Sequence, residues 1–118
     1  MAQVFHLRQL LAELHGCNGQ IGDPAALMAA LARGAEQVGA SVISDSLVTY
    51  TPHGSTVVVF LAESHAMVTT WPELDIALVD ILLCNVSMDY EVVLREVVRL
   101  LEPARVSRQF YERPAPSC

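Results

Sequence analysis

The sequence has few basic residues and no long apolar run. Its 7 lysine and arginine residues are outnumbered by 13 aspartates and glutamates, which gives a net charge of −6. Nucleic-acid binding relies on basic side chains that neutralise phosphates, so this charge balance argues against a nucleic-acid partner. No segment approaches the roughly 20 apolar residues that cross a bilayer, and no signal-type segment opens the chain. We therefore expect a cytoplasmic protein with no membrane partner.

Cysteine is also scarce. The chain has 3 cysteines, Cys17, Cys84 and Cys118, at wide spacings. An odd number at such spacings is typical of free thiols in a reducing compartment rather than of a disulfide framework. No Cys-x-x-Cys or His-x-x-x-His pair occurs, so the sequence gives no support for a metal site.

Apolar residues, in contrast, are abundant. They make up 53% of the 118 residues, a high share for one small domain, and a subunit interface often buries such an excess. The length suits one domain and is too short for two. We expect a single domain over residues 1–113, a loose tail over 114–118, and a homodimer.

Two helices are predicted. One runs from about Asp23 to Val38, because Asp23 can cap it, Pro24 suits its first position and Gly39 can close it. The second runs from about Ser87 to Glu102, where apolar residues recur every three or four positions. Both helices have one apolar face.

Strands are predicted at 41–51, from Ser55 to Ser64, at 75–84 and at 104–113, with a hairpin turn at Pro52 and Gly54. The segment 4–17 fits either a helix or a strand by its pattern. Antiparallel strands in series with two helices predict a two-layer α+β sandwich with both helices on one face of the sheet. A second copy of the chain can cover the other face.

The predicted strand "STVVVFLAES" ends in an unusual group, Glu63-Ser64-His65. Neighbours in a strand point to opposite faces, so the three do not form a catalytic triad, and a polar strand end is the simpler interpretation. Regular alternation places Thr56 and Ser64 on one face and His65 on the other. Further on, Trp71-Pro72-Glu73 offers an aromatic plate and a carboxylate in a loop, which suits a nucleoside.

These motifs together resemble the bacterial and archaeal S-adenosylmethionine decarboxylase family. The resemblance rests on "HGSTVVVFLAESH", then "TWPE", Asp80 and Cys84, and on "HLRQLLAELHGC" near the start. It implies that the first segment is a strand and that the proenzyme cuts itself between Glu63 and Ser64, leaving a pyruvoyl group. That group forms a Schiff base with the substrate amine, so neither a metal nor pyridoxal phosphate is required. The product is the aminopropyl donor for spermidine-type polyamines.

The resemblance also implies a role for each site residue. Ser64 is the pyruvoyl precursor, with Glu63 as its partner at the cut, and Cys84 is the proton donor. Tyr50 and Trp71 flank the nucleoside, and Glu73 holds the ribose hydroxyls. Without the resemblance, the simpler interpretation of Cys84 is a packed core thiol. Tyr50 and Trp71 would then be ordinary core aromatics, and Glu73 a solvated acid in a loop. The family's two protomers stack their sheets, with the sites near the contact.

The chain departs from the family pattern at the residue that assists processing. Thr69 stands where the family has a histidine, and a hydroxyl is a far weaker base near neutral pH. Thr56 replaces a processing serine and keeps the hydroxyl, and Asn85 replaces a glycine. Three alternatives stay open: His65 or His53 takes the base role; the chain stays uncleaved, as a non-catalytic binder of S-adenosylmethionine or regulator of a partner; or the substrate is arginine or ornithine.

Overall fold

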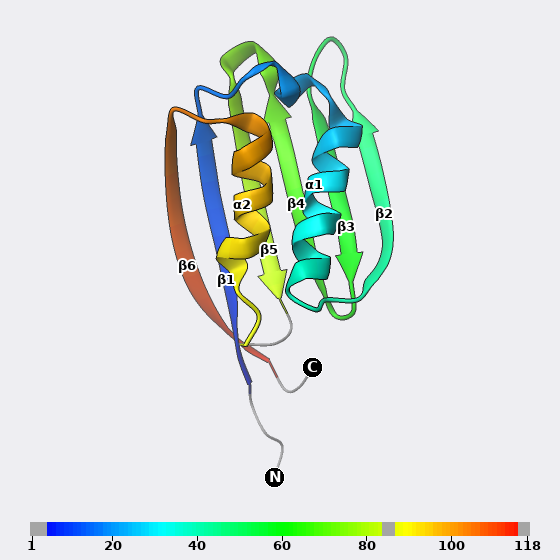
Figure 1. Ribbon diagram of the computed structural model, residues 1–118, viewed down its shortest axis with the longest axis vertical. Coiled ribbons are helices and arrows are strands. Elements are labelled where there is room, and N and C mark those ends of the chain that lie inside the picture. Colours follow the sequence, from blue (N-terminus) through cyan, green and yellow to red (C-terminus); the bar gives the residue numbers. More distant parts are fainter. Residues whose placement is uncertain (1–4, 84–86, 116–118) are drawn as a thin grey trace.

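A six-stranded sheet forms one layer of the molecule and two helices form the other (Figure 1). The computed structural model describes residues 5–83 and 87–115. All neighbouring strands are antiparallel, and their order across the sheet is β2-β3-β4-β5-β1-β6. The strands are β1 (Phe5–His15), β2 (Val42–Thr49), β3 (Ser55–Leu61), β4 (Ser64–Trp71), β5 (Ile76–Leu83) and β6 (Arg105–Ala115). The predicted α+β class is confirmed, and the first segment is a strand.

Both helices begin at aspartate caps. In α1 (Pro24–Gln37), Asp23 accepts a hydrogen bond from the main-chain N–H of Ala26 at 3.1 Å. In α2 (Tyr90–Leu101), Asp89 accepts one from Glu91 at 2.9 Å, so this helix begins three residues later than the predicted start at residue 87. Each cap satisfies a main-chain donor that the first helical turn leaves unpaired. Short 3₁₀ helices, η1 (Gly19–Gly22) and η2 (Pro72–Leu74), complete the secondary structure.

The strand prediction was wrong in one respect. The predicted strand up to Ser64 ends at Leu61, and the chain reverses through Ala62 and Glu63 into β4, a strand that was not predicted. Glu63 adopts a left-handed conformation, with φ of 62°, which tightens the turn. The β2–β3 hairpin is confirmed, with a cis Thr51–Pro52 bond and Gly54 at φ 95°.

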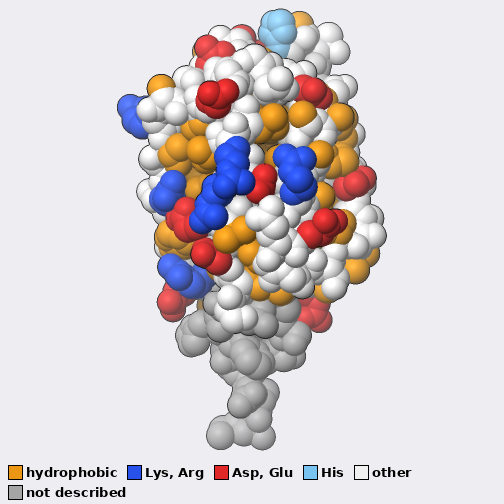
Figure 2. All heavy atoms as spheres, viewed as in Figure 1, with side chains coloured by type: hydrophobic (Ala, Val, Ile, Leu, Met, Phe, Trp, Pro, Cys, Tyr) orange, Lys and Arg blue, Asp and Glu red, His pale blue; other side chains and the backbone are white. Residues whose placement is uncertain are grey.

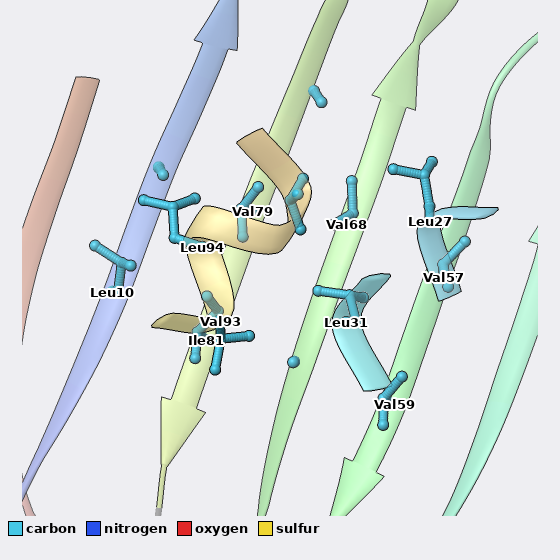
Figure 3. Packing of buried hydrophobic residues seen from close by; sticks show 14 of the residues in the cluster. Leu10, Leu27, Leu31, Val57, Val59, Val68, Val79, Ile81, Val93 and Leu94 are labelled. Carbon is cyan, nitrogen blue, oxygen red and sulfur yellow. The ribbon is translucent and has the colours of Figure 1, made fainter. Parts of the chain in front are cut away.

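The hydrophobic core lies between the helices and the sheet, as Figure 3 shows. Leu27 and Leu31 of α1 and Val93 and Leu94 of α2 point toward the strands. Alternate strand residues meet them, because successive side chains in a strand face opposite sides. The strand residues of this layer include Leu10, Val57, Val59, Val68, Val79 and Ile81, all at most 2% exposed. Neither helix is long and apolar enough to cross a membrane.

The other side of the sheet, here called the open face, carries the remaining strand side chains with no helix over them. It includes large apolar residues that stay partly exposed, namely Leu11 (37%), Phe60 (42%), Trp71 (39%) and Leu78 (39%). On the opposite side, Figure 2 shows basic and acidic side chains interspersed over the helices. The main chain of β6 pairs with β1 as far as residue 115, so 114 and 115 belong to the sheet.

Candidate functional site

Ser64 is the first residue of β4 and lies directly after the β3–β4 turn. It pairs with Leu61, and its hydroxyl donates a hydrogen bond to the main-chain carbonyl of Ala62 at 3.3 Å. The scissile bond of the predicted cut therefore joins the left-handed Glu63 to a partly buried serine. The expectation that Ser64 continues the strand of Thr56 is wrong, because the turn reverses the chain between them.

The open face is hollowed beside this turn. The hollow, here called the hairpin cavity, has a volume of about 490 Å³. Ser64 and His65 are both among its lining residues, although they begin β4 on opposite faces: Ser64 pairs with the buried Leu61 of the helix side, and His65 pairs with Phe60 of the open face. The lining comprises Val58, Phe60, Glu63, Ser64, His65, Met67, Asp80 and Leu82.

A group of three hydroxyls lies on the same face, farther along the sheet. Thr56 of β3 pairs with Thr69 of β4, and their hydroxyl oxygens are 3.0 Å apart. The phenol oxygen of Tyr50 lies 2.7 Å from the Thr56 hydroxyl. Thr69, which we expected to stand in place of a processing histidine, thus belongs to a chain of three hydroxyls.

Trp71 and Glu73 lie at the end of the sheet that carries these three hydroxyls, away from Ser64. Trp71 ends β4, and Glu73 is exposed in η2. Thr69 and Trp71 line a second hollow of about 470 Å³, the central cavity, which also borders Leu11, Leu78 and Glu13. Met67 and Asp80 line both cavities, so the two hollows adjoin along the open face.

The predicted site residues therefore fall into two groups on one chain. Ser64 and Thr69 are five residues apart on β4, and a strand advances about 3.3 Å per residue, so their main chains are roughly 16 Å apart. Glu63 and Ser64 lie at one end of the sheet, and Tyr50, Thr56, Thr69, Trp71 and Glu73 lie at the other. A single chain does not bring the two groups into contact.

The predicted proton donor, Cys84, and its neighbour Asn85 lie outside the described residues. Leu83, which precedes Cys84, ends β5 beside Ser64, because His65 pairs with Leu82. Among the described cysteines, Cys17 is buried, and burial is the main cause that raises the pKa of its thiol. A neutral thiol of this kind is a core residue rather than a nucleophile.

Sequence reasoning missed a polar network on the open face. His65 Nε2 lies 3.2 Å from Asp80 Oδ1, and Gln9 Nε2 donates to the same oxygen at 2.8 Å. Arg113 donates to the Gln9 side-chain oxygen at 2.8 Å. Strict alternation along "IALVDILL" places Asp80 among the apolar open-face positions of β5, and a half-buried carboxylate there requires partners. The carboxylate of Asp80 at an apolar position of this strand was therefore the feature of the sequence that could have indicated the network.

No cluster of metal-ligating side chains occurs within residues 5–83 and 87–115. The described side chains of the site are a hydroxyl, an imidazole paired with a carboxylate, and partly or fully exposed aromatic and acidic groups.

Comparison with known proteins links this geometry to one family. Residues 8–114 match the family model described as S-adenosylmethionine decarboxylase. An S-adenosylmethionine decarboxylase proenzyme from Aquifex aeolicus is 33% identical over 105 residues, which cover 88% of this chain and 78% of that protein. The proenzyme from Pyrobaculum islandicum is 32% identical over 114 residues, covering 95% of this chain and 91% of that protein.

The solved structures agree in fold. The crystal structure of the Aquifex aeolicus adenosylmethionine decarboxylase superposes with a TM-score of 0.80 at 28% sequence identity. The match covers 95% of this chain and 92% of that one. The similarity thus extends over the whole sandwich rather than over a shared motif alone.

Proposed function

Because the chain belongs to the S-adenosylmethionine decarboxylase family, we propose that it cuts itself between Glu63 and Ser64 and then decarboxylates S-adenosylmethionine. The observation that carries the proposal is the β3–β4 turn, where a left-handed non-glycine residue precedes a partly buried serine hydroxyl beside a cavity. Non-glycine residues in this conformation store strain of about 1–3 kcal/mol, which favours a reaction that breaks the turn. The product is the aminopropyl donor for spermidine-type polyamines.

The residues at the turn fit the pyruvoyl group expected of this family. Ser64 supplies the atoms of the pyruvoyl group, and the hairpin cavity provides space for a substrate next to this residue. Once formed, the group supplies an electron sink for the loss of CO2 from an α-amino acid. Val58, Phe60 and Leu82 keep one wall of that cavity apolar, which limits water at the reacting atoms. Cys84 remains the proposed proton donor to the substrate carbon.

The separation of the two residue groups supports a homodimer whose protomers stack their open faces. In a two-fold assembly the same surface of both chains meets, so the Trp71 end of one sheet can cover the Ser64 end of the other. Each site then takes Ser64 from one protomer, and Tyr50, Trp71 and Glu73 from its partner. The partly exposed apolar residues of the open face would be buried by this contact.

Intact mass spectrometry tests the proposal directly. We expect two fragments that meet at the Glu63–Ser64 bond, with the larger one blocked by a pyruvoyl group, and release of CO2 from S-adenosylmethionine. Ser64→Ala is the matched control and should stay one chain without activity. The same assay with arginine and ornithine identifies the substrate class. A wild-type chain that keeps its full mass and releases no CO2 from any of the three would refute the proposal.

A second candidate function follows from Thr69. Its hydroxyl is bonded within the Tyr50–Thr56 group and replaces the family's histidine, which favours an uncleaved chain that binds S-adenosylmethionine or regulates a partner without catalysis. Thr69→His separates the two functions, with Thr69→Asn as a polar control that adds no base. Cleavage in the histidine variant alone would establish the non-catalytic function for the natural chain, and complete cleavage of the wild type would exclude it.

A further inference from the structure

His65 is held by a network that spans four strands, β4, β5, β1 and β6. Its Nε2 lies 3.2 Å from Asp80 Oδ1 on β5, Gln9 on β1 donates to that same oxygen, and Arg113 on β6 donates to Gln9. The side chains of His65 and Asp80 are 30% and 24% exposed, so solvent reaches the pair only in part. The imidazole therefore has a defined orientation on the wall of the hairpin cavity.

The network also selects a tautomer. Asp80 accepts hydrogen bonds, so Nε2 carries the proton and donates to it, and Nδ1 of the neutral ring is left as a proton acceptor. Nδ1 is the ring nitrogen nearer to the His65 main chain, and hence to the peptide that links His65 to Ser64. A carboxylate behind an imidazole stabilises the imidazolium that forms when the ring takes a proton.

Two other histidines, His15 and His53, lie at the far end of the sheet. His15 approaches Glu13 at 4.0 Å at the end of β1, where it pairs with Ile76. His53 is exposed in the β2–β3 hairpin. Of these three histidines, His65 is the one that shares a cavity with Ser64.

We propose that His65, oriented by Asp80, accepts the α-proton of Ser64 when the serine is converted to the pyruvoyl group. This inference rests on the proposed function and assigns to His65 the base role that Thr69 cannot perform. His65 is then a catalytic residue of processing, and Asp80 is a positioning residue that acts through it.

The steps balance with water as the one added reactant. The Ser64 hydroxyl oxygen bonds to the Glu63 carbonyl carbon, the C–N bond breaks, and the proton passes to the released amine, giving an ester. His65 then removes the α-proton, the electron pair forms the Cα–Cβ double bond, and the Glu63 carboxylate leaves from Cβ. The resulting enamine becomes an imine, water adds, and ammonia departs to leave the ketone.

His65→Asn tests this assignment, with His15→Asn as the matched control on another open-face histidine. General-base catalysis contributes about 10²–10⁴-fold, so we expect the pyruvoyl fragment to form at least about 100-fold more slowly in His65→Asn. The ester has the same mass as the uncut chain but is split by hydroxylamine. Hydroxylamine should therefore cut His65→Asn after Glu63, and His15→Asn should process like the wild type.

Three further variants test whether any loss is chemical rather than structural. Adding Thr69→His to His65→Asn should restore pyruvoyl formation by supplying a base from the family's usual position. Asp80→Ala should slow processing, and Asp80→Asn should recover part of the rate, because an amide oxygen still accepts from Nε2–H.

The outcomes distinguish this inference from the proposed function. If the wild type processes and His65→Asn processes at the same rate, the assignment to His65 is overturned and the decarboxylase function stands. If the wild type neither processes nor yields a hydroxylamine-sensitive ester, both fail. Loss of processing in His53→Asn but not in His65→Asn would move the base role to His53.

Discussion

Thr69 and His65 lie on the same face of β4 but in different chemical surroundings. Thr69 bonds with another hydroxyl, and His65 bonds with a carboxylate. A threonine hydroxyl offers no basic atom, whereas a neutral imidazole has one ring nitrogen that can accept a proton. At the scale of single residues, the capacity for proton transfer is therefore at His65, at the Ser64 end of the strand.

Glu96 is a second residue whose surroundings determine its charge. It is 6% exposed, accepts from Gln37 at 2.9 Å and from Arg99 at 3.3 Å, and has Arg33 at 3.6 Å. The hydrogen bond from Gln37 is the largest cause that lowers the pKa of Glu96, and the two arginines add to it against the effect of burial. The charged form is thus favoured in the folded state.

Glu96→Gln should destabilise the protein near neutral pH, and the difference from the wild type should shrink in acid. Because folding lowers the pKa of Glu96, the unfolded chain binds a proton at this residue at a higher pH than the folded chain does. The stabilisation by charged Glu96 is therefore complete above the pKa of glutamate in the unfolded chain, about 4.3. It is lost as the pH falls through the lower pKa that Glu96 has in the folded protein. Urea unfolding from pH 7 to pH 3 measures this. Glu91→Gln is the control, because its ion pair with Arg108 is more exposed and worth about 0–1 kcal/mol. A constant difference at every pH would contradict the prediction.

At the scale of elements, the two helices pack closely at Gly34. A Cβ added there would lie 2.7 Å from the Val93 Cα of α2, which is closer than real Cβ contacts. The close approach lets both helices lie flat on the same sheet face and bury Leu31 and Leu94 together (Figure 3). This glycine has a packing role, although glycine is otherwise unfavourable within a helix.

Gly34→Ala should lower the free energy of unfolding. Overpacking costs about 1–3 kcal/mol, which outweighs the gain of up to about 1 kcal/mol in helix propensity. Gly22→Ala is the matched control, since a Cβ there meets no atom within 4 Å. Chemical denaturation of both variants provides the comparison. A Gly34→Ala protein as stable as the wild type would show that the helices separate without cost.

At the scale of the whole molecule, the two faces of the sheet differ. One face is covered by both helices, and the other leaves apolar and polar site residues exposed. The two halves of the proposed site lie at opposite ends of this open face, roughly 16 Å apart by strand spacing. The proposed assembly through the open face would therefore affect catalysis as well as stability.

Leu78→Lys should convert the proposed dimer into a monomer and abolish decarboxylation, because a buried lysine without a partner opposes the contact. Leu47→Lys is the matched control: Leu47 is 38% exposed and Leu78 is 39%, but Leu47 lies on the helix side of β2. Light scattering at micromolar concentration measures the assembly state. A Leu78→Lys protein that keeps the wild-type mass, or a wild type that is already monomeric, would refute the open-face dimer.

The sequence by itself determined the helices, most strands and the family, because caps, periodicity and motif order are local properties. Asp23 and Pro24 predicted α1, and "ESH" followed by "TWPE" indicated the family. The tertiary structure alone decided where the site residues lie. Alternation along one strand placed Thr56 with Ser64, but the left-handed Glu63 reverses the chain and separates them. Pairing between distant strands likewise brought His65, Asp80 and Gln9 together, because hydrogen-bond partners across a sheet depend on register, which no local pattern specifies.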